Sequence, residues 1–579
     1  MPYNHFDYVP SGISKSRSVF KFSKVISAGC DIGYLYPMCK PVPMLPGSSL
    51  KLNLAMEVRS GALIAPLQDE ILLDVYAFKV PNRIVWEHWK QFLGSVDDVL
   101  FDNLTEYQIP SFLYCGFQYD EGWNKPFVAS RLLACCFELP AFNYRAGTSP
   151  YTSPRISALP FRGYNFIWNE FFRPEQLVQP ILFSKTDAGY TGDNMEYGEQ
   201  VINSVHYTLT PATGLGTDIP KPGGCVLPTF RVHKSLWTSC LPKPSLETLN
   251  LLGDLQAPVG YIGSQSVTTS VSNVVGSPSG VTVVPGDFYQ VGSGSSAYGD
   301  VIADLSQAIL TVNNYRETIM LQNYYDALNR AGSRYDEIIR NIFHVQTNFA
   351  VIDIPELIVH KRFTIFRKDV VSTARTETDA GVITQLGQQA SYIDTVVKDS
   401  FFTTSMTEHG YVHLLYTIRP ARIRMAQGIE PDWSKLDKFD MYYPQFDGMG
   451  DVPRYKKELY LADTAVSGDL DAIFGYQEYG AEYKYQRNSA VGWTDVNLTN
   501  HIAGLTLCEQ LSAQPTLAAG SYYGIGSYIS CAIEAIAFAK CLGISNNQVA
   551  PQFIVDIRLN GEIVHPMPVY NIPGMGDLL

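Results

Sequence analysis

A short run of residues near the start of the chain constrains the fold more than any other feature. In residues 50–58, apolar and mostly polar side chains alternate, and the apolar set is Leu50, Leu52, Leu54, Met56 and Val58. A period of two places alternate side chains on opposite faces of an extended strand. The turn-forming sequence LPG at residues 45–47 precedes the run. The pattern therefore predicts a strand with one face in a core and one face in solvent.

Strand patterns recur far along the chain and are separated by long excursions. A more fully buried strand is predicted at residues 70–81, and further strands are predicted within residues 411–427, 456–463, 481–486 and 552–570. In the last of these, Asn560 and Gly561 both tolerate the positive φ of a type I′ turn, so they predict a hairpin. Strands far apart in sequence, without a fixed-period repeat, are typical of a jelly roll with large insertions.

Three helices are predicted between these strands. The first covers residues 82–94, with Asn82 as its cap and Gly94 as its end. The second begins at Leu159 and stops at Pro174, and it carries apolar side chains at helical spacing. The third covers residues 301–332 and ends at Gly332; its predicted apolar stripe is Val301, Leu305, Ala308, Val312, Tyr315 and Ile319.

The composition favours a loop-rich, mainly β protein that associates with other chains. The chain of 579 residues contains 45 glycines, 35 prolines and 36 tyrosines, but only 17% of its residues are charged. A lightly charged, tyrosine-rich surface suits burial against other chains. The formal net charge of −13 argues against a chain that wraps nucleic acid by its own electrostatics. If the protein encloses nucleic acid, a separate basic partner is expected to neutralise most of it.

Cysteine usage and hydropathy predict an unexported protein. The ten cysteines include no C-x-x-C pair and no zinc-ribbon spacing, so reduced structural thiols are expected. The N-terminal sequence lacks the apolar segment of a signal peptide. The most apolar late stretch, residues 527–544, is interrupted by Glu534 and Lys540 and is too short to span a bilayer. We expect a soluble protein without a classical export signal or a membrane anchor, and no cofactor.

Residues 246–300 differ in amino-acid composition from the rest of the chain. They are poor in charge and rich in serine, glycine, threonine and valine, and they show no helical periodicity. A flexible linker and a surface insertion with short strands both fit such a stretch, and the repeated Val-Thr pairs favour the insertion.

The stretch TEHGYVHLLY at residues 407–416 resembles the zinc site of a helical protease. His409 and His413 are four residues apart, which brings two ligands together on a helix but separates them by about 13 Å on a strand. The alternation of the stretch and Gly410 both favour a strand. The glutamate precedes the first histidine, so the H-E-x-x-H arrangement is absent. We therefore predict no metal site and no catalytic site. His409 and His413 remain candidates for a contact that weakens at mildly acidic pH.

Two further sets of residues are candidates for contacts. The N-terminal basic run could face nucleic acid inside an assembly or form an ordinary solvated arm, and it consists of Lys15, Arg17, Lys21 and Lys24. Tryptophans could stack on single-stranded bases, but packing in the core or at a subunit interface is favoured. The packing candidates are Trp86, Trp89, Trp168, Phe171, Phe172 and Trp237.

Motifs distributed over nearly the whole chain resemble the major capsid protein of small single-stranded-DNA phages, the Microviridae, and specifically the gokushovirus branch. The motifs occur in family order and are LPGSSLKL (45–52), FKVPNRIVWEHWKQFLG (78–94), LPFRGYNFIWNEFFRPEQL (159–177), WTSCLPKP (237–244), ADLSQAILTVNNYR (303–316), GSRYDEIIRNIFHV (332–345), TEHGYVHLLYTIRP (407–420), FGYQEYGAEYKYQ (474–486) and MPVYNIPGMGDLL (567–579).

The resemblance implies a fold and a set of partners. It implies one domain over residues 1–579, a single eight-stranded antiparallel jelly roll of the viral capsid type with large loop and helix insertions. It also implies a T=1 icosahedral shell of copies of this chain around circular single-stranded DNA, located in the virion and assembled in the bacterial cytoplasm. Residues 246–300 are the candidate for a protrusion at the threefold axis that contributes to host attachment.

The implied partners besides other copies of the chain are a small basic DNA-associated internal protein, the packaged DNA, a pilot or minor spike protein and a host surface receptor. The alternative is a secreted or surface β-rich protein that binds or acts on carbohydrate. Such a protein needs a polar catalytic or sugar-binding cluster, and no motif of that kind is evident in the sequence.

Overall fold

The computed structural model describes the long strands of a mainly antiparallel β protein. The described residues are 17–61, 70–93, 107–113, 133–140, 155–175, 180–181, 185–187, 200–202, 205–207, 227–228, 230, 236–237, 239–244, 259–262, 300–303, 312–331, 334–342, 353–371, 376–377, 383–384, 389–421, 428–459, 472–486 and 551–570.

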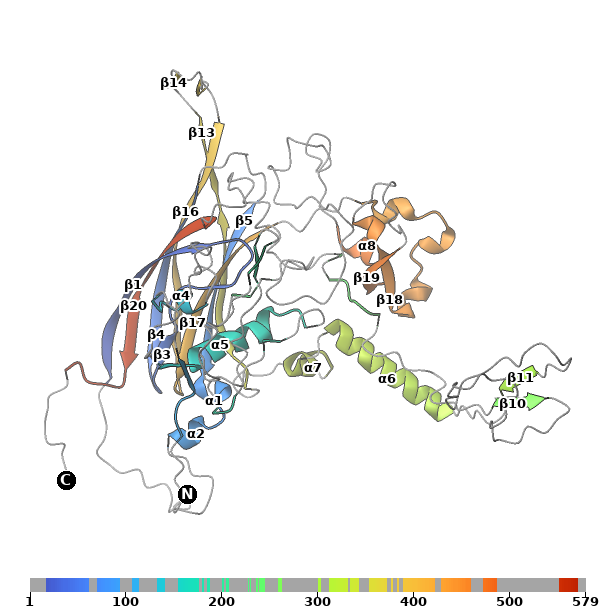
Figure 1. Cartoon of the computed structure of the whole chain (residues 1–579), viewed down its shortest axis with the longest axis horizontal. Coiled ribbons are helices and arrows are strands. Elements are labelled where there is room, and N and C mark those ends of the chain that lie inside the picture. The colour runs from blue at the N-terminus through green and yellow to red at the C-terminus, as the bar shows by residue number, and fades with distance from the viewer. Residues whose placement is uncertain are drawn as a thin grey trace, which may run out of the picture. The chain divides into compact units, whose positions relative to one another are not determined.

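One sheet joins strands from the two ends of the sequence. Its neighbours pair antiparallel in the order β1 (Ser18–Cys30), β20 (Phe553–His565), β4 (Ser49–Ser60), β16 (Gln389–Ser405) and β13 (Arg367–Val371). In Figure 1, blue β1 lies beside red β20, so an N-terminal and a C-terminal strand are neighbours.

A second antiparallel sheet contains the most buried strands of the chain. Its order is β12 (Glu356–Ile365), β5 (Ile71–Pro81), β17 (Gly410–Pro420) and β2 (Tyr36–Pro37), and β3 (Val42–Met44) also pairs with β17. Together the two sheets confirm the predicted mainly antiparallel β fold. The number of strands in the predicted jelly roll stays a prediction.

Shorter elements connect or extend these sheets. The remaining strands are β6 (Ser111–Leu113), β7 (Arg155–Ser157), β8 (Gln200–Ile202), β9 (Val205–Tyr207), β10 (Val259–Ile262), β11 (Asp300–Ala303), β14 (Thr376–Glu377), β15 (Ile383–Thr384), β18 (Asp451–Tyr455) and β19 (Ile473–Glu478). The α-helices are α1 (Asn82–Val85), α2 (Trp89–Phe92), α4 (Leu133–Cys136), α5 (Leu159–Ile167), α6 (Val312–Ala331), α7 (Tyr335–Ile342) and α8 (Ala481–Lys484). A π-helical turn, η1 (Trp168–Phe172), follows α5 directly. The 3₁₀ turns are η3 (Pro431–Ser434), η4 (Lys438–Asp440), η5 (Pro444–Met449) and η6 (Lys456–Glu458).

The two sheets differ in how many of their faces are buried. In β4 the side chains of residues 50, 52, 54, 56 and 58 are buried while those of Lys51 and Asn53 are exposed, which confirms the strand predicted from the alternation. In β5 and β17 nearly every residue is buried. The central strands β5 and β17 are therefore covered on both faces, whereas β12 at the edge is only partly buried, and a near-continuous apolar run such as ILLDVYAFKV is the sequence pattern of a strand covered on both faces.

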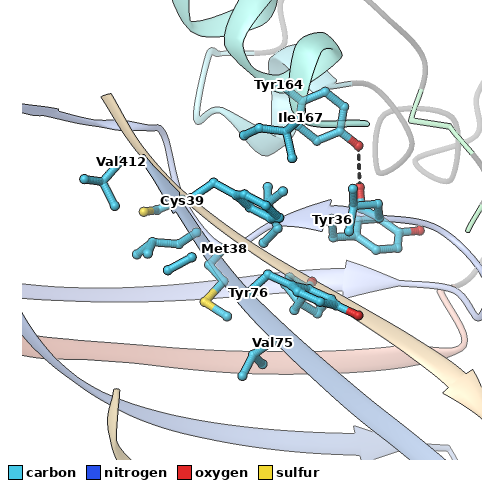
Figure 2. Close-up of a cluster of buried hydrophobic side chains, with 14 of the residues drawn as sticks. Tyr36, Met38, Cys39, Val75, Tyr76, Tyr164, Ile167 and Val412 are labelled. Carbon is cyan, nitrogen blue, oxygen red and sulfur yellow. Dashed lines mark hydrogen bonds between the residues drawn. The ribbon is translucent and has the colours of Figure 1, made fainter. Parts of the chain in front are cut away.

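Helix α5 covers the second sheet and begins and ends close to its predicted bounds. It starts at Leu159, continues into η1 and stops before Pro174. Tyr164 donates a hydrogen bond from its hydroxyl to the Leu35 carbonyl at 2.7 Å. Figure 2 shows Tyr164 and Ile167 of α5 in the buried cluster that also contains Tyr36 of β2 and Val412 of β17. These contacts make α5 part of the main core.

The other two predicted helices differ from the structure. Residues 82–94 form two short helices, α1 and α2, because Trp86 adopts an extended conformation with φ −146 and ψ 120. Pro81, not Asn82, occupies the cap position, and Gly94 lies outside the described residues. The described part of the long helix begins at Val312, and Val301 lies in β11, which pairs with β10. Leu305, Ala308 and the predicted end at Gly332 lie outside the described residues. The predicted stripe fails at Ile319, which is 39% exposed.

Two predicted strands are also corrected. Residues 481–484 form α8, and residues 456–458 form a 3₁₀ turn. In residues 481–484 apolar and charged residues alternate over too few positions for the period to distinguish a strand from a single helical turn, whereas residues 456–458 are all charged and carry no period of two. Residues 422–427 and 460–463 of the predicted strands lie outside the described residues.

The hairpin predicted at Asn560 and Gly561 is wrong. β20 runs without a break from Phe553 to His565 and pairs with β1 and β4 across this dipeptide. A Cβ atom at Gly561 would lie 1.9 Å from the Lys51 carbonyl oxygen of β4. The glycine therefore permits a close approach of two backbones in the sheet interior, which is the other common reason for glycine in a strand.

The chain divides into two compact units. Residues 245–330 form the smaller unit, and residues 1–244 and 331–579 form the larger one. In the smaller unit, β10 and β11 pair antiparallel and are followed by α6. Most of residues 246–300 lie outside the described residues, so their predicted role as a protrusion stays a prediction. Among the described helices, none is both long and apolar enough to cross a membrane.

The close approach at Gly561 makes a prediction about stability. Gly561→Ala should lower the free energy of unfolding by on the order of 2 kcal/mol or more, because the added Cβ forces β20 away from β4. Chemical denaturation measures the change. Glu562→Ala is the matched control, since Glu562 is exposed on the same strand. Equal denaturation midpoints for the two variants would contradict the packing inferred at Gly561.

Candidate functional site

His413 is buried inside the chain and not available for a contact at the surface. Its side chain in β17 is 1% exposed, and neither ring nitrogen has a hydrogen-bond partner among the described residues. A Cβ atom at Gly163 of α5 would lie 2.6 Å from Nε2 of His413. Gly163 therefore provides the space that the imidazole occupies. Burial lowers the pKa of His413 to about 3.

His409 has different surroundings from His413. It precedes β17 and packs edge-on against Trp89, with ring centroids 5.7 Å apart, whereas the ring of His413 lies 6.4 Å from that of Phe137. The predicted strand is confirmed from Gly410 onwards. In the described part of the chain, no group of three or more His, Cys, Asp and Glu side chains is placed to hold a metal ion.

The pH-sensitive role predicted for His413 needs correction. With a pKa of about 3, the folded chain keeps this imidazole neutral at mildly acidic pH. The side chain is also too deeply buried to contact another chain. A pH-sensitive contact at His409 stays a prediction.

A buried carboxylate links three strands of the second sheet. Asp74 of β5 is 1% exposed at its side chain and accepts hydrogen bonds from Arg419 Nε of β17 at 2.6 Å and Arg362 Nε of β12 at 2.8 Å. His360 Nε2 lies 3.2 Å from the same carboxylate. Burial alone would raise the pKa of Asp74, but the hydrogen bonds from His360, Arg362 and Arg419 bring it well below its usual range. This ion cluster joins the strands and keeps the Asp74 carboxylate ionised and bound to the two arginines.

The predicted packing residues lie inside this chain. Trp86, Trp168 and Trp237 are at most 2% exposed. Trp86 donates a hydrogen bond from Nε1 to Asp187 at 2.7 Å, and Trp237 donates one to Glu458 at 3.4 Å. Trp89 and Phe172 are also buried, and Phe171 packs against the main core. These side chains stabilise the subunit itself and do not supply a surface for bases or for a neighbouring chain.

Only two of the four residues of the basic N-terminal run are seen to be exposed to solvent. Lys24 lies 2.6 Å from Glu138 Oε2 and is committed to that ion pair. Lys21 and Arg17 are exposed, and Lys15 lies outside the described residues. A role of this run in facing nucleic acid stays a prediction.

The described residues expose a group of large apolar side chains in residues 433–446 and 483–485. We call this group the exposed aromatic surface; it consists of Trp433, Leu436, Phe439, Met441, Tyr442, Tyr443, Phe446, Tyr483 and Tyr485. Leu436 is 90% exposed and Trp433 is 77% exposed. Single exposed apolar residues are ordinary on a protein surface, but a group of this size makes these segments the candidate binding surface of the described residues.

The two segments of the surface are tied together by specific contacts. The rings of Tyr442 and Tyr479 stack with centroids 5.2 Å apart, and Tyr479 donates a hydrogen bond from its hydroxyl to the Met441 carbonyl at 3.2 Å. Lys435 Nζ lies 3.9 Å from the ring centroid of Tyr483 and 2.6 Å from Asp432 Oδ1. The 3₁₀ turns therefore pack onto the segment that contains α8.

Local hydrogen bonds fix the turns that carry the exposed residues. Asp440 Oδ2 accepts hydrogen bonds from the backbone N–H groups of Asp437 at 2.7 Å and Leu436 at 2.9 Å. These two bonds lower the pKa of Asp440. Asp437 Oδ1 in turn accepts from the N–H of Lys438 at 2.6 Å. The apolar side chains of this segment are thus held out by an ordered backbone.

Sequence reasoning missed this surface, although a signal was present. Trp433, Leu436, Phe439 and Tyr442 follow one another at intervals of three residues, between Pro431 and Pro444. Only Trp433 and Phe439 of these four lie in 3₁₀ turns, which are separated by extended residues. A spacing of three fits neither the 3.6-residue period of an α-helix nor the two-residue period of a strand, so the segment gives no regular helix or strand signal.

Comparisons with known proteins agree on one family. A family model described as "Capsid protein (F protein)" matches residues 9–575. The chain is similar to "Capsid protein VP1" of Chlamydia phage 1, with 26% identity over 99% of this chain and 98% of the relative. It is similar to proteins of the same name from Spiroplasma virus 4, with 26% identity over 94% of this chain and 93% of the relative, and from Bdellovibrio phage phiMH2K, with 24% identity over 82% of each.

Burial of His413 predicts a contribution to acid sensitivity. The unfolded chain protonates this histidine near pH ~6.5, whereas the folded chain resists protonation down to about pH 3. Between these values the unfolded state binds more protons, so the free energy of unfolding falls as the pH falls, by up to about 1.4 kcal/mol per pH unit. His413→Gln removes this histidine, so the free energy of unfolding of the variant should fall less steeply than that of the unaltered chain as the pH is lowered from 6.5 to 4.

Chemical denaturation of the unassembled subunit at a series of pH values measures that slope. Tyr411→Phe is the control, because it alters a neighbouring residue of β17 without removing a group that titrates in acid. If His413→Gln and Tyr411→Phe keep the same slope as the unaltered chain, the inferred protonation behaviour is incorrect.

Proposed function

The chain belongs to the phage capsid protein (F protein) family, and on this premise we propose that its copies close into a T=1 icosahedral shell around a circular single-stranded DNA genome. The protein is a structural major capsid protein, as the resemblance to the gokushovirus branch of the Microviridae predicted. The observation that carries the proposal is the family match over residues 9–575, because it includes every strand of both sheets.

The net charge of the chain supports a second protein that neutralises the packaged DNA. Its net charge of −13 leaves most of the DNA phosphate charge unneutralised. We therefore include in the proposal a small basic internal protein that accompanies the DNA. Lys21 and Arg17 are the described candidates for a local contact with the genome, since both are exposed.

Host attachment is the part of the proposal that concerns residues 246–300. These residues belong to the compact unit of residues 245–330, which supports a role separate from that of the two large sheets. In the proposal they form a protrusion at the threefold axis that binds a host surface receptor, together with a pilot or minor spike protein. The shell is assembled in the host cytoplasm and the protein is then a component of the virion.

The carbohydrate-binding or carbohydrate-active alternative has no observation in its favour. Among the described residues, the buried carboxylate of Asp74 is bound by two arginines, and the three matched relatives are all named as capsid proteins. The function therefore rests on association between surfaces.

The proposed shell is tested by electron microscopy of the purified protein. We expect negative stain to show uniform closed particles, because closed point symmetry limits the number of copies in each particle. Encapsidated DNA, where present, should resist nuclease until the particles are disrupted. A monomer that hydrolyses a glycan would instead establish the alternative.

Deletion of residues 250–298 tests the proposed attachment role. The shortened chain should remain soluble and form shells, while adsorption of those shells to host cells should be lost. Intact shells prepared in the same way are the control, and cell-bound particles are counted in a sedimentation assay. Loss of shell formation in the deletion variant would contradict the assignment of this stretch to a surface protrusion.

A further inference from the structure

The exposed aromatic surface is built on a segment with a small core of its own. The segment of α8 against which Tyr442 and Lys435 pack contributes Ala481 to a separate buried cluster, which consists of Leu236, Trp237, Cys240, Leu459, Phe474 and Ala481. None of the residues of the exposed aromatic surface belongs to that cluster, and Trp433, Leu436 and Phe439 each expose more than half of their surface. Exposing ordered apolar residues forgoes the stabilisation that burial provides. Their position therefore indicates a surface kept for a partner.

The exposed area matches one side of a stable protein interface. At ~200 Å² for each large side chain, the fractional exposures of this surface amount to on the order of 900 Å². A standard interface buries about 800 Å² on each partner. Trp and Tyr residues are also the types that most often supply the central contacts of interfaces.

The charges within the surface exclude single-stranded DNA as the occupant. Residues 428–450 contain five carboxylates, Glu430, Asp432, Asp437, Asp440 and Asp447, against two lysines, Lys435 and Lys438. Lys435 is already paired with Asp432. Proteins that stack bases on aromatic side chains combine them with a positively charged groove, so an acidic aromatic surface suits a protein partner instead.

We propose that the exposed aromatic surface binds a second copy of this chain and is one of the contacts that join subunits. This inference rests on the proposed function, since a shell supplies many copies of the chain at fixed distances. In a ring of subunits around an axis, each contact is heterologous, so the surface meets a different patch of its neighbour. Its acidic rim then favours a facing patch that combines apolar and basic side chains.

The test compares self-association of two variants by sedimentation velocity over a range of concentrations. A triple variant with Trp433→Ser, Leu436→Ser and Phe439→Ser should raise the concentration for half-association at least about ten-fold, because it removes the most exposed apolar side chains. A matched variant with Trp433→Phe, Leu436→Met and Phe439→Leu keeps apolar side chains at the same positions. It should stay within about three-fold of the unaltered chain.

Fluorescence supplies a second readout that does not depend on loss of association. The quenching of Trp433 by acrylamide, obtained as the difference between the unaltered chain and Trp433→Phe, should be strong in the free subunit and weak after association. Because the three positions are exposed, the thermal midpoint of the free subunit should be the same in the triple variant and the unaltered chain.

The outcomes separate this inference from the proposed shell. If the unaltered chain forms only small oligomers and the triple variant weakens them, the T=1 shell fails while the contact stands. If closed shells form equally well from the triple variant and Trp433 stays quenchable in shells of the unaltered chain, the contact fails while the shell stands. A chain that remains monomeric at every concentration overturns both. Protection of Trp433 by added single-stranded DNA, without association, also overturns the contact.

Discussion

The pairing of β1 with β20 is the constraint on which the rest of the structure depends. It joins Ser18 to His565 and continues in register to Cys30 and Phe553, while β20 pairs on its other side with β4. The entropy cost of closing a loop grows by only about 0.6 kcal/mol for each doubling of its length. Once these strands pair, long segments can be inserted between them at little further cost. The separate unit of residues 245–330 is such an insertion.

Two glycines show how closely this framework is packed. Gly561 lets the backbones of β20 and β4 approach, and Gly163 lets helix α5 lie against His413 of β17. In both cases any side chain would meet atoms closer than van der Waals contact allows. The same packing encloses His413 and removes it from the surface. Contacts with other molecules are therefore made by surfaces outside this packed framework.

Buried and exposed aromatic residues have different roles in the subunit. Tryptophans of the main core stabilise the subunit, whereas Trp433 lies exposed in the 3₁₀ turn of residues 431–434. The low content of charged residues favours association, because few ionic groups must be desolvated when such surfaces meet. A structural capsid protein requires this division, since it must be stable as a subunit and also bind its neighbours.

Sequence patterns alone determined the strands β4, β5 and most of β17 and helix α5, because buried faces impose periods that the sequence records directly. The family followed from motifs distributed along the chain. Tertiary structure alone decided the role of Gly561, the break at Trp86 and the pairing of Val301 in β11. It also decided that His413 is enclosed while Trp433 is exposed. An Asn-Gly pair has the same local preference in a hairpin and in a strand beside another backbone. Likewise, a tryptophan has the same side chain in a core and at an interface. Only contacts with residues distant in sequence distinguish these environments.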